Sequence, residues 1–396
     1  MREFIHYREA LEIIQKNLHH GKAIEKPLHD CLGYYTAQDE FAPYDYPLFD
    51  NSAMDGYGFA IQDLKVENKY PINGEIRAGS NKMPAYKTAQ ASRIFTGAPV
   101  PDWMDIIIPK EQCEVLMNQV KVVSESFVQG ANIRPKASQT KKGALILPAG
   151  TKINAGIIGY LAAFGLQKLS VYAYPEIGVL VTGDELVSAG TVPKFGQVFE
   201  SNSLALLALL RESSIQPLFV KKVADSHQSL QTEIETAIPV CDVLILTGGI
   251  SAGDYDFVRE AILANGVKKL FYKIRQRPGK PMFVGKKDNT IIFALPGNPA
   301  SVFTCFQVYA KPLIRAFSSG GKEYLSMHEG TLTHDFSKKK GLSFFFKCLV
   351  EKNMITVLGG QESYKMDSFV AANALVVLEE DAEEIKAGDR VLYIKL

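Results

Sequence analysis

Residues 176–317 alternate short apolar runs with helix-forming segments, and this alternation constrains the fold more than any other feature. Three apolar runs have the length of strands, at residues 177–181, 243–246 and 291–295. Each is followed by a polar loop and then by a segment that can begin a helix. Strands that alternate with helices form a parallel sheet with helices on both faces. We therefore expect a doubly wound α/β domain in this region.

The predicted helices carry their own start signals. Asn202 stands between two serines ahead of an apolar run, as at a helix N-terminus. Asp225 precedes Gln228 by three residues, the spacing of a capping box, so Asp225 is expected to cap a helix. Asn298 can cap the helix that follows the third strand, and Pro299 suits its first position.

The rest of the chain is predicted to be rich in β-strands. Residues 25–175 carry short apolar runs separated by proline and glycine every few residues. After about residue 323 the helix signals vanish, and short strand-like runs indicate a small β-domain. An amphipathic helix is expected at the start, because apolar residues recur at helical spacing from Tyr7 to Leu18. The fold class is thus multidomain, α/β plus β.

Charge, hydropathy and cysteine content disfavour several classes of protein. Lys and Arg number 44 against 43 Asp and Glu, which is not the basic excess of a nucleic-acid binder. No apolar run approaches the ~18 residues of a membrane span, and charges stand where a signal peptide has its apolar core. The 5 cysteines are scattered without CxxC spacing, so we expect a reducing cytoplasm and neither disulfides nor a zinc site.

Glycine-rich polar loops follow the three predicted strands, at residues 182–185, 247–256 and 296–301. The carboxyl ends of parallel strands share one edge of the sheet, and ligands bind there. Glycines let backbone N–H groups approach a phosphate, and helix N-termini favour anions. A simple turn is the alternative for each loop alone. The residues expected to bind substrate here are Thr182, Gly183, Asp184, Gly248, Gly249, Ser251, Pro296, Gly297, Asn298, Pro299 and Ser301.

Carboxylates crowd the same edge, at Asp184, Glu185, Asp254 and Asp256, with Asp225 after a short strand of its own. Carboxylates beside a phosphate repel it unless a cation intervenes, and oxygen ligands facing phosphates are the usual setting of Mg²⁺. Helix capping is the alternative for Asp225 and Asp256.

Positive charge is concentrated in Lys273-Ile-Arg-Gln-Arg-Pro-Gly-Lys. Lys273, Arg275 and Arg277 alternate, so on a strand they would share one face, and Lys280 follows a Pro-Gly turn. This segment is either a solvated edge strand or a clamp for an oxyanion or polyphosphate. A second run, Lys338-Lys-Lys, is typical of a solvated loop.

Six motifs, in one order, resemble a known family. They are Asp50-Asn-Ser-Ala-Met-Asp-Gly-Tyr, Thr96-Gly-Ala-Pro-Val-Pro, Thr182-Gly-Asp-Glu-Leu, Gly248-Gly-Ile-Ser-Ala-Gly-Asp-Tyr-Asp, Arg277-Pro-Gly-Lys-Pro and Leu295-Pro-Gly-Asn-Pro-Ala-Ser. Together they closely resemble the molybdopterin molybdenumtransferases, the MoeA family, essentially from end to end.

The resemblance implies an enzyme of molybdenum cofactor biosynthesis. Its substrates would be molybdate and adenylylated molybdopterin, a pterin dithiolene joined to AMP through a phosphoanhydride. The enzyme would bind Mg²⁺, cleave the anhydride, place molybdenum on the dithiolene sulfurs and release AMP. It would be cytoplasmic, could contact the adenylyltransferase that makes its substrate, and would bind neither nucleic acid nor membrane.

The resemblance also implies an elongated homodimer of four-domain subunits. Domain I would be discontinuous, comprising residues 1–45 and 132–175. Domain II, over 46–131, would be a β-rich insertion into it. Domain III, over 176–322, would be the α/β molybdopterin-binding domain, and domain IV, over 323–396, would be β-barrel-like.

Site residues follow from the family's motifs, position by position. Asp55 and Thr96 would be catalytic and would enter the cleft from the partner subunit. Glu185, Asp225 and Asp256 would be the catalytic acids and the Mg²⁺ ligands. The anionic substrate would face Lys273, Arg277, Lys280, Lys347 and Ser363.

Three positions depart from the family's pattern. Gln139 replaces an acid, so that position is left out of the site, and Glu362 replaces the glycine of the family's Gln-Gly-Ser. Lys347 stands where the family usually has arginine, and lysine cannot form a two-pronged contact with an oxyanion.

Two other functions share parts of this pattern. The adenylyltransferase that makes the substrate has a related α/β domain, but the β-rich N-terminal half and the separate C-terminal domain argue against it. The C-terminal domain of gephyrin resembles the family and acts as a peptide-binding scaffold. Retention of the acids Asp55, Glu185, Asp225 and Asp256 favours catalysis, because scaffolding needs none of them.

Overall fold

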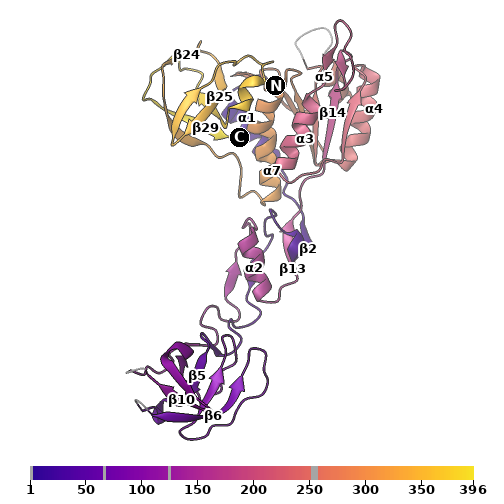
Figure 1. Ribbon diagram of the computed structural model, residues 1–396. Coiled ribbons are helices and arrows are strands. Elements are labelled where there is room, and N and C mark those ends of the chain that lie inside the picture. The colour runs from indigo at the N-terminus through magenta and orange to yellow at the C-terminus, as the bar shows by residue number, and fades with distance from the viewer. Residues whose placement is uncertain (1–2, 66–67, 124–125, 251–256) are drawn as a thin grey trace. The chain divides into compact units, whose positions relative to one another are not determined.

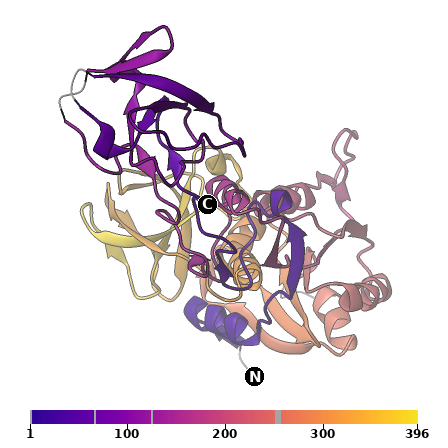
Figure 2. The same cartoon turned by 90° about the horizontal axis from the view of Figure 1, so that it is seen from below.

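A computed structural model describes residues 3–65, 68–123, 126–250 and 257–396. The chain forms two compact units (Figures 1 and 2). The first comprises Met1–Ala37, Gly150–Asn154 and Lys168–Leu396, and the second comprises Gln38–Ala149 and Ala155–Gln167.

A seven-stranded sheet organises the first unit, in the order β1-β19-β21-β22-β18-β14-β17. Strands β22, β18, β14 and β17 pair in parallel, as a doubly wound fold requires. Strand β21 is antiparallel to both of its neighbours, and the N-terminal strand β1 adds a parallel edge that the sequence did not predict. The strands are β1 (Glu3–Ile5), β14 (Ile177–Thr182), β17 (Phe219–Val223), β18 (Val243–Thr247), β19 (Lys268–Ile274), β21 (Phe283–Lys287) and β22 (Thr290–Leu295).

Alternate side chains of the central strands enter two different cores. On β22, Ile291, Phe293 and Leu295 pack into one core, and Ile292 and Ala294 pack into the other. Successive strand residues point to opposite faces, so a strand covered by helices on both faces must be apolar throughout. This is why the three central strands could be predicted as continuous apolar runs.

Helices cover both faces of this sheet, and Figure 1 shows α3 and α4 on opposite sides of β14. One core holds α1 (Tyr7–Asn17), α3 (Asn202–Glu212), α6 (Pro299–Cys305), the π-helical turn η5 (Phe306–Ala310) and α7 (Lys311–Ser318). The other holds α4 (His227–Ala237) and α5 (Phe257–Ala264). The 3₁₀ turn η4 (Ile238–Val240) follows α4.

The C-terminal region forms a second sheet whose strands close on themselves. Its order is β20-β25-β26-β23-β29-β27, and β27 also pairs with β25. The prediction of a small C-terminal β-domain is therefore confirmed. Its elements are β20 (Gln276–Arg277), β23 (His328–Leu332), β24 (Phe336–Ser337), β25 (Ser343–Glu351), β26 (Met354–Val357), η6 (Asp367–Val370), β27 (Ala374–Leu378), β28 (Glu384–Ile385) and β29 (Arg390–Lys395).

Short elements complete the first unit. Strands β2 (Ala23–Pro27) and β13 (Lys168–Tyr172) pair antiparallel, and η1 (Leu28–Asp30) follows β2. Strands β15 (Leu186–Val187) and β16 (Val198–Phe199) form a small parallel pair beyond the end of β14.

The second unit is built mainly from strands, as predicted for this part of the sequence. A six-stranded sheet runs in the order β8-β5-β7-β6-β10-β9, and Figure 2 shows its strands from below. The elements are β3 (Glu40–Phe41), β4 (Asn51–Ser52), β5 (Gly56–Phe59), η2 (Ile61–Asp63), β6 (Lys69–Ile76), β7 (Ala91–Ile94), β8 (Ile106–Pro109), η3 (Lys110–Gln112), β9 (Cys113–Leu116), β10 (Gln119–Val122), β11 (Ile133–Arg134), β12 (Leu145–Leu147) and α2 (Ala155–Ala163).

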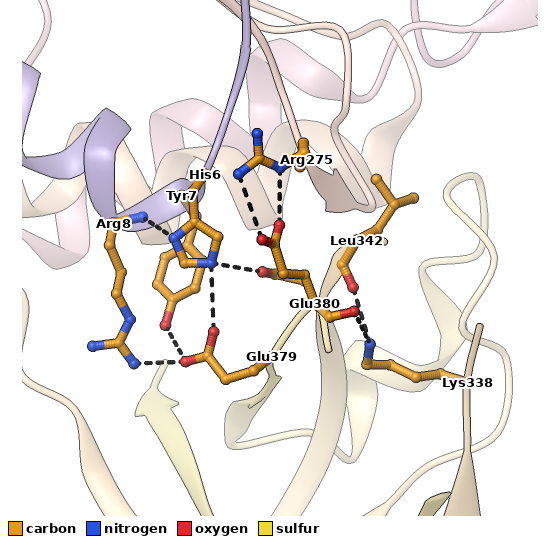
Figure 3. A network of polar contacts seen from close by, with 9 residues as sticks. His6, Tyr7, Arg8, Arg275, Lys338, Leu342, Glu379 and Glu380 are labelled. Carbon is orange, nitrogen blue, oxygen red and sulfur yellow. Dashed lines mark hydrogen bonds and ion pairs between the residues drawn. The ribbon is translucent and has the colours of Figure 1, made fainter. Parts of the chain in front are cut away.

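Two adjacent glutamates join the C-terminal sheet to the α/β part (Figure 3). Glu379 accepts hydrogen bonds from the Tyr7 hydroxyl at 2.8 Å and from the Arg8 guanidinium at 2.6 Å. Glu380 accepts one from Arg275 Nε at 2.9 Å. The N-terminal helix, the segment after β19 and the C-terminal sheet thus converge on these two carboxylates.

The run beginning at Lys338 is not the fully solvated loop that the sequence predicts. Lys338 is buried, and its ammonium group donates to the carbonyls of Leu342 at 3.1 Å and Glu380 at 3.5 Å (Figure 3). The expectation is wrong here because a run of like charges reveals nothing of the carbonyls that tertiary contacts bring to one of its members.

A substitution on β22 tests how much the packing of this strand into the two cores contributes to stability. Phe293 is fully buried, so we expect Phe293→Ala to lower the free energy of unfolding by about 3–5 kcal/mol, through lost burial and the cavity left behind. The exposed Phe195 supplies the control, because Phe195→Ala removes the same atoms without opening a cavity. Denaturant unfolding followed by circular dichroism measures both, and equal effects would contradict the assignment.

Candidate functional site

The three loops predicted to meet at the sheet edge do meet there. The Asn202 side-chain amide donates to Thr247 Oγ1 at 3.1 Å and to the Gly297 carbonyl at 2.8 Å. The Thr247 hydroxyl in turn donates to the Pro296 carbonyl at 3.1 Å. One buried asparagine at the start of α3 therefore ties the loop after β18 to the loop after β22.

Glycine is required where the first two loops pass each other. Gly248 has φ +97°, and a β-carbon there would lie 2.0 Å from the Thr182 carbonyl oxygen. Any side chain at this position would both strain the backbone and push the loops apart. The predicted role of Gly248 in close backbone approach thus has a structural basis, although the backbone approached in the structure is that of Thr182.

A pocket of about 580 Å³ opens at this edge, within the range of small-ligand sites. Glu185, Asn202 and Gly249 contribute to its lining, together with the Pro296–Pro299 segment. Its apolar wall, formed by Leu186, Val198, Phe199, Ile250 and Tyr364, was not predicted. The Val198-Phe199 pair was the available signal, an exposed apolar pair just ahead of the α3 N-terminus.

Asp225 does not cap the following helix, so the capping-box expectation is wrong. The N-cap of α4 is Ser226, whose hydroxyl accepts from the backbone N–H of Ser229 at 3.3 Å. Asp225 Oδ1 instead accepts from the Thr182 hydroxyl at 3.0 Å. The shift of one residue turns the Asp225 carboxylate toward the end of β14 and makes it available to the site.

Carboxylates that could hold a cation lie at this edge. Glu185 lines the pocket, and within the described residues its carboxylate has no hydrogen-bond or ion-pair partner. Asp184 Oδ1 accepts from the Asp225 backbone N–H at 3.4 Å. No group of three or more metal-ligating side chains occurs among the described residues, and Ser251, Asp254 and Asp256 lie outside them. Hard carboxylate oxygens such as those of Glu185 and Asp225 suit Mg²⁺.

The N-terminus of α6 is contacted by a loop from the C-terminal sheet. Pro299 begins the helix and Asn298 is its N-cap residue, as predicted, but the Asn298 amide caps nothing. It donates to the Ser363 hydroxyl oxygen at 2.9 Å, while the Ala300 N–H donates to the Ser363 carbonyl at 3.1 Å. Ser301 is buried on the first turn. The structure thus brings Ser363 to the predicted site.

Lys347 holds this loop in place. Its side chain is buried, which lowers its pKa, and its ammonium donates to the carbonyls of Gly360 at 2.5 Å and Lys365 at 2.9 Å. The Gln361 amide bonds both the N–H and the carbonyl of Lys347, at 3.0 and 2.8 Å. Two of the three ammonium donors of Lys347 are therefore used within the loop that carries Ser363.

The cations Lys273, Arg275 and Arg277, at the end of β19 and just beyond it, do not share one strand face, so that expectation is wrong. Lys273 has φ +61°, which breaks the alternation of an extended strand, and Arg275 pairs with Glu380. The other cations lie over aromatic rings, at 4.9 Å for Lys273 on Tyr272, 5.7 Å for Arg277 on Phe344 and 4.8 Å for Lys280 on Phe4. Of this stretch, Pro281 lines the pocket.

Asp55 and Thr96 form a direct contact inside the second compact unit. The backbone N–H and the hydroxyl of Thr96 both donate to Asp55 Oδ1 at 2.9 Å, and Lys110 Nζ lies 3.9 Å from Oδ2. These hydrogen bonds hold the pKa of Asp55 below its ordinary 3.8. The two catalytic residues that the resemblance implied for this part of the chain are thus neighbours.

Family models define the class of protein to which this fold and site belong. They match the MoeA N-terminal region (domain I and II) over residues 5–165, a probable molybdopterin binding domain over 178–316 and the MoeA C-terminal region (domain IV) over 329–396. No helix in the described part of the chain is long and apolar enough to cross a membrane.

Full-length relatives and solved structures agree with these matches. Molybdopterin molybdenumtransferases from Staphylococcus epidermidis and a Nostoc species are 30% and 32% identical, each over 98% of this chain and over 94% and 89% of their own lengths. A MoeA crystal structure from Pyrococcus horikosii has a TM-score of 0.84 at 26% identity and covers 99% of both chains. The chain belongs to the molybdopterin molybdenumtransferase family, which is a family of enzymes. The predicted fold class and the prediction of an enzyme are confirmed.

The hydroxyl of Thr96 should be measurable in the titration of Asp55. We expect Thr96→Val to raise the Asp55 pKa toward 3.8, because one donor to the charged form is lost. A carboxyl whose pKa is lowered in the folded state contributes stability above its unfolded pKa, and this stability is lost as pH falls through the folded pKa. The contribution of Asp55 should therefore be smaller in the variant, and its loss should be complete at a higher pH. Carboxyl ¹³C NMR measures the shift. Asp335 is the control: hydrogen bonds from Ala387 and Lys386 lower its pKa, and the substitution at Thr96 should leave that pKa unchanged. An unchanged Asp55 pKa would contradict the contact with Thr96.

Proposed function

We propose that this chain inserts molybdenum from molybdate into adenylylated molybdopterin and releases AMP in a Mg²⁺-dependent step. The observation that supports this most is the pocket at the carboxyl edge of the parallel strands. It combines glycine-rich loops, an apolar wall and the Glu185 carboxylate, which has no partner within the described residues. Names of the full-length relatives supply the molybdopterin chemistry.

The two halves of the pocket suit the two ends of such a substrate. The wall of Leu186, Phe199, Ile250 and Tyr364 offers the flat apolar surface on which a pterin ring can pack. The loop of Pro296–Pro299 and Gly249 offers close backbone approach for the phosphoanhydride. The substrate would therefore lie with its ring against β15–β16 and its phosphates over the strand ends.

The carboxylates of Asp225 and Glu185 would hold the cation. The Thr182 hydroxyl fixes one oxygen of Asp225, leaving the other oxygen for a cation shared with Glu185. When bound, Mg²⁺ supplies neutralisation of the negative charge that builds as the anhydride breaks. An oxygen of molybdate or water attacks the anhydride, so the mechanism requires no nucleophile from the protein.

We also propose a two-fold homodimer in which the Asp55–Thr96 pair faces the α/β site of the partner subunit. The pair belongs to a compact unit other than that of Glu185 and Asp225, and the family resemblance assigns both groups to one cleft. A cytoplasmic location and contact with the substrate-making adenylyltransferase complete the proposal, and the 5 free cysteines suit a reducing compartment.

Removal of Asp225 tests the cation site. We expect Asp225→Ala to reduce Mg²⁺-dependent AMP release by about 10²–10³-fold, because an electrostatic contact to the reacting group is lost. AMP release from adenylylated molybdopterin, with and without molybdate and with Mg²⁺ varied, measures the effect. Asp335→Ala, which removes an exposed carboxylate from the C-terminal sheet, is the matched control. Full activity in folded Asp225→Ala would sink the assignment, and molybdate-independent AMP release would sink the proposed reaction.

Mixed subunits test the shared cleft. Asp55→Asn and Glu185→Gln should each be inactive alone. If the cleft is shared, a heterodimer has one cleft with both lesions and one with neither, so mixing should restore part of the AMP release. No restoration, with subunit exchange demonstrated by mass spectrometry, would rule out placement of Asp55 in the partner's cleft.

A further inference from the structure

A second cavity, of about 270 Å³, lies at the far end of the helices that start at the catalytic edge. Helix α3 begins with Asn202 at that edge and ends at Glu212, which lines the second cavity. At about 1.5 Å per residue, the 11 residues of α3 separate the two places by roughly 16 Å. The second cavity is therefore separate from the pocket at the sheet edge, and segments that precede the α/β part also line it.

Positive charge dominates the lining of this cavity. Lys152, Lys311 and Arg315 contribute three cations, and Glu212 is the one acidic side chain among its lining residues. Lys152 and Arg315 are exposed, whereas Lys311 is buried, so two cations stand at the mouth and one at the floor. The net charge of the lining side chains is +2, before the main-chain carboxylate of the lining residue Leu396 is counted.

The ammonium group at the floor lacks a carboxylate partner. Lys311 is only 9% exposed, and its Nζ donates to Gln307 Oε1 at 2.7 Å. Within the described chain no acidic side chain lies at ion-pair distance from it. Burial, followed by repulsion from Arg315, lowers the Lys311 pKa. Buried cations in proteins are ordinarily paired with an anion, so this one lacks its usual counterpart.

Gln307 leaves a further donor beside Lys311. A lysine only donates, so the amide oxygen must face it, and the amide nitrogen then points elsewhere. In the described structure that nitrogen is buried and has no hydrogen-bond partner. Gln307 lies in the π-helical turn η5, which forms where Pro312 cannot donate to Val308. Turns of this kind often occur at functional sites.

The tyrosines of the cavity add no negative charge. Tyr174 donates its hydroxyl to the Gly33 carbonyl at 3.0 Å, and burial raises its pKa to about 12. Tyr35 donates to Glu323 at 2.5 Å, and Lys152 lies 5.8 Å from the centre of its ring. Both rings act as neutral walls, so Glu212 is the one lining side chain that offsets the three cations.

We propose that this cavity binds a dianion of the phosphate class, at a site separate from the catalytic pocket. The three cations outnumber the acidic groups of the lining, and the Arg315 guanidinium presents several donors in a plane that suits a phosphate dianion. The volume accommodates inorganic phosphate or the monoester of a small molecule. Lys311 contacts the anion from the floor while Arg315 and Lys152 close over it from the mouth.

Titration calorimetry with two probes tests the site, at constant ionic strength maintained with potassium chloride. The probes are inorganic phosphate and glycerol 3-phosphate. We expect saturable binding that Arg315→Gln weakens by about tenfold or more, as the loss of a charge-assisted hydrogen bond implies. Arg315 is exposed, so this variant should fold, and Lys311→Met adds a second test at the floor.

Two matched variants locate the binding. Arg211→Gln removes an exposed cation from the end of α3 that does not line the cavity, and Asp225→Ala alters the catalytic edge; neither should change the affinity. Tighter binding of the ester would identify a monoester as the ligand, and equal or tighter binding of phosphate would identify the free anion. No saturable binding of either probe, or an equal loss in Arg211→Gln, would overturn the proposal.

Discussion

The buried amide of Asn202 is the contact on which the geometry of the candidate site depends. Two loops nearly fifty residues apart in sequence meet through its donors, one at Thr247 and one at Gly297. Both loops leave parallel strands at the same edge, so the sheet brings them near and the amide sets their spacing. The glycine at 248 permits the approach to Thr182, and together these contacts shape the candidate pocket.

The C-terminal sheet contributes to that pocket although it has a core of its own. Lys347 and Gln361 use their polar groups within one loop, which places Ser363 at the N-terminus of α6 and Tyr364 in the pocket wall. The contacts of Glu379 and Glu380 with Tyr7, Arg8 and Arg275 hold the same sheet against the α/β part. The charged side chain of Lys347 therefore stabilises the backbone of the loop through hydrogen bonds to its carbonyls.

Helices α3 and α6–α7 run between the candidate-site pocket and the basic cavity. Each begins at the catalytic edge and ends at the basic cavity, where buried Lys311 faces Gln307. Unpartnered polar groups inside a protein are costly. Among the described residues, the Asn202 side-chain oxygen and the Gln307 side-chain nitrogen have no hydrogen-bond partner, and Asn202 also lines the candidate pocket.

The sequence by itself determined the central strands, the loops at their ends and the family. A strand buried on both faces must be apolar at every position, so the local sequence of residues 177–181 is enough to predict a buried strand. Glycine is required where two backbones touch, so Gly248 could likewise be identified from the sequence around it. Side-chain partners were decided by the tertiary structure. Asp225 turns to Thr182 rather than to its helix, Lys338 reaches carbonyls of a distant strand end, and Lys273 leaves the extended conformation. Such choices depend on donors and acceptors far away in sequence, which become neighbours only when the chain has folded.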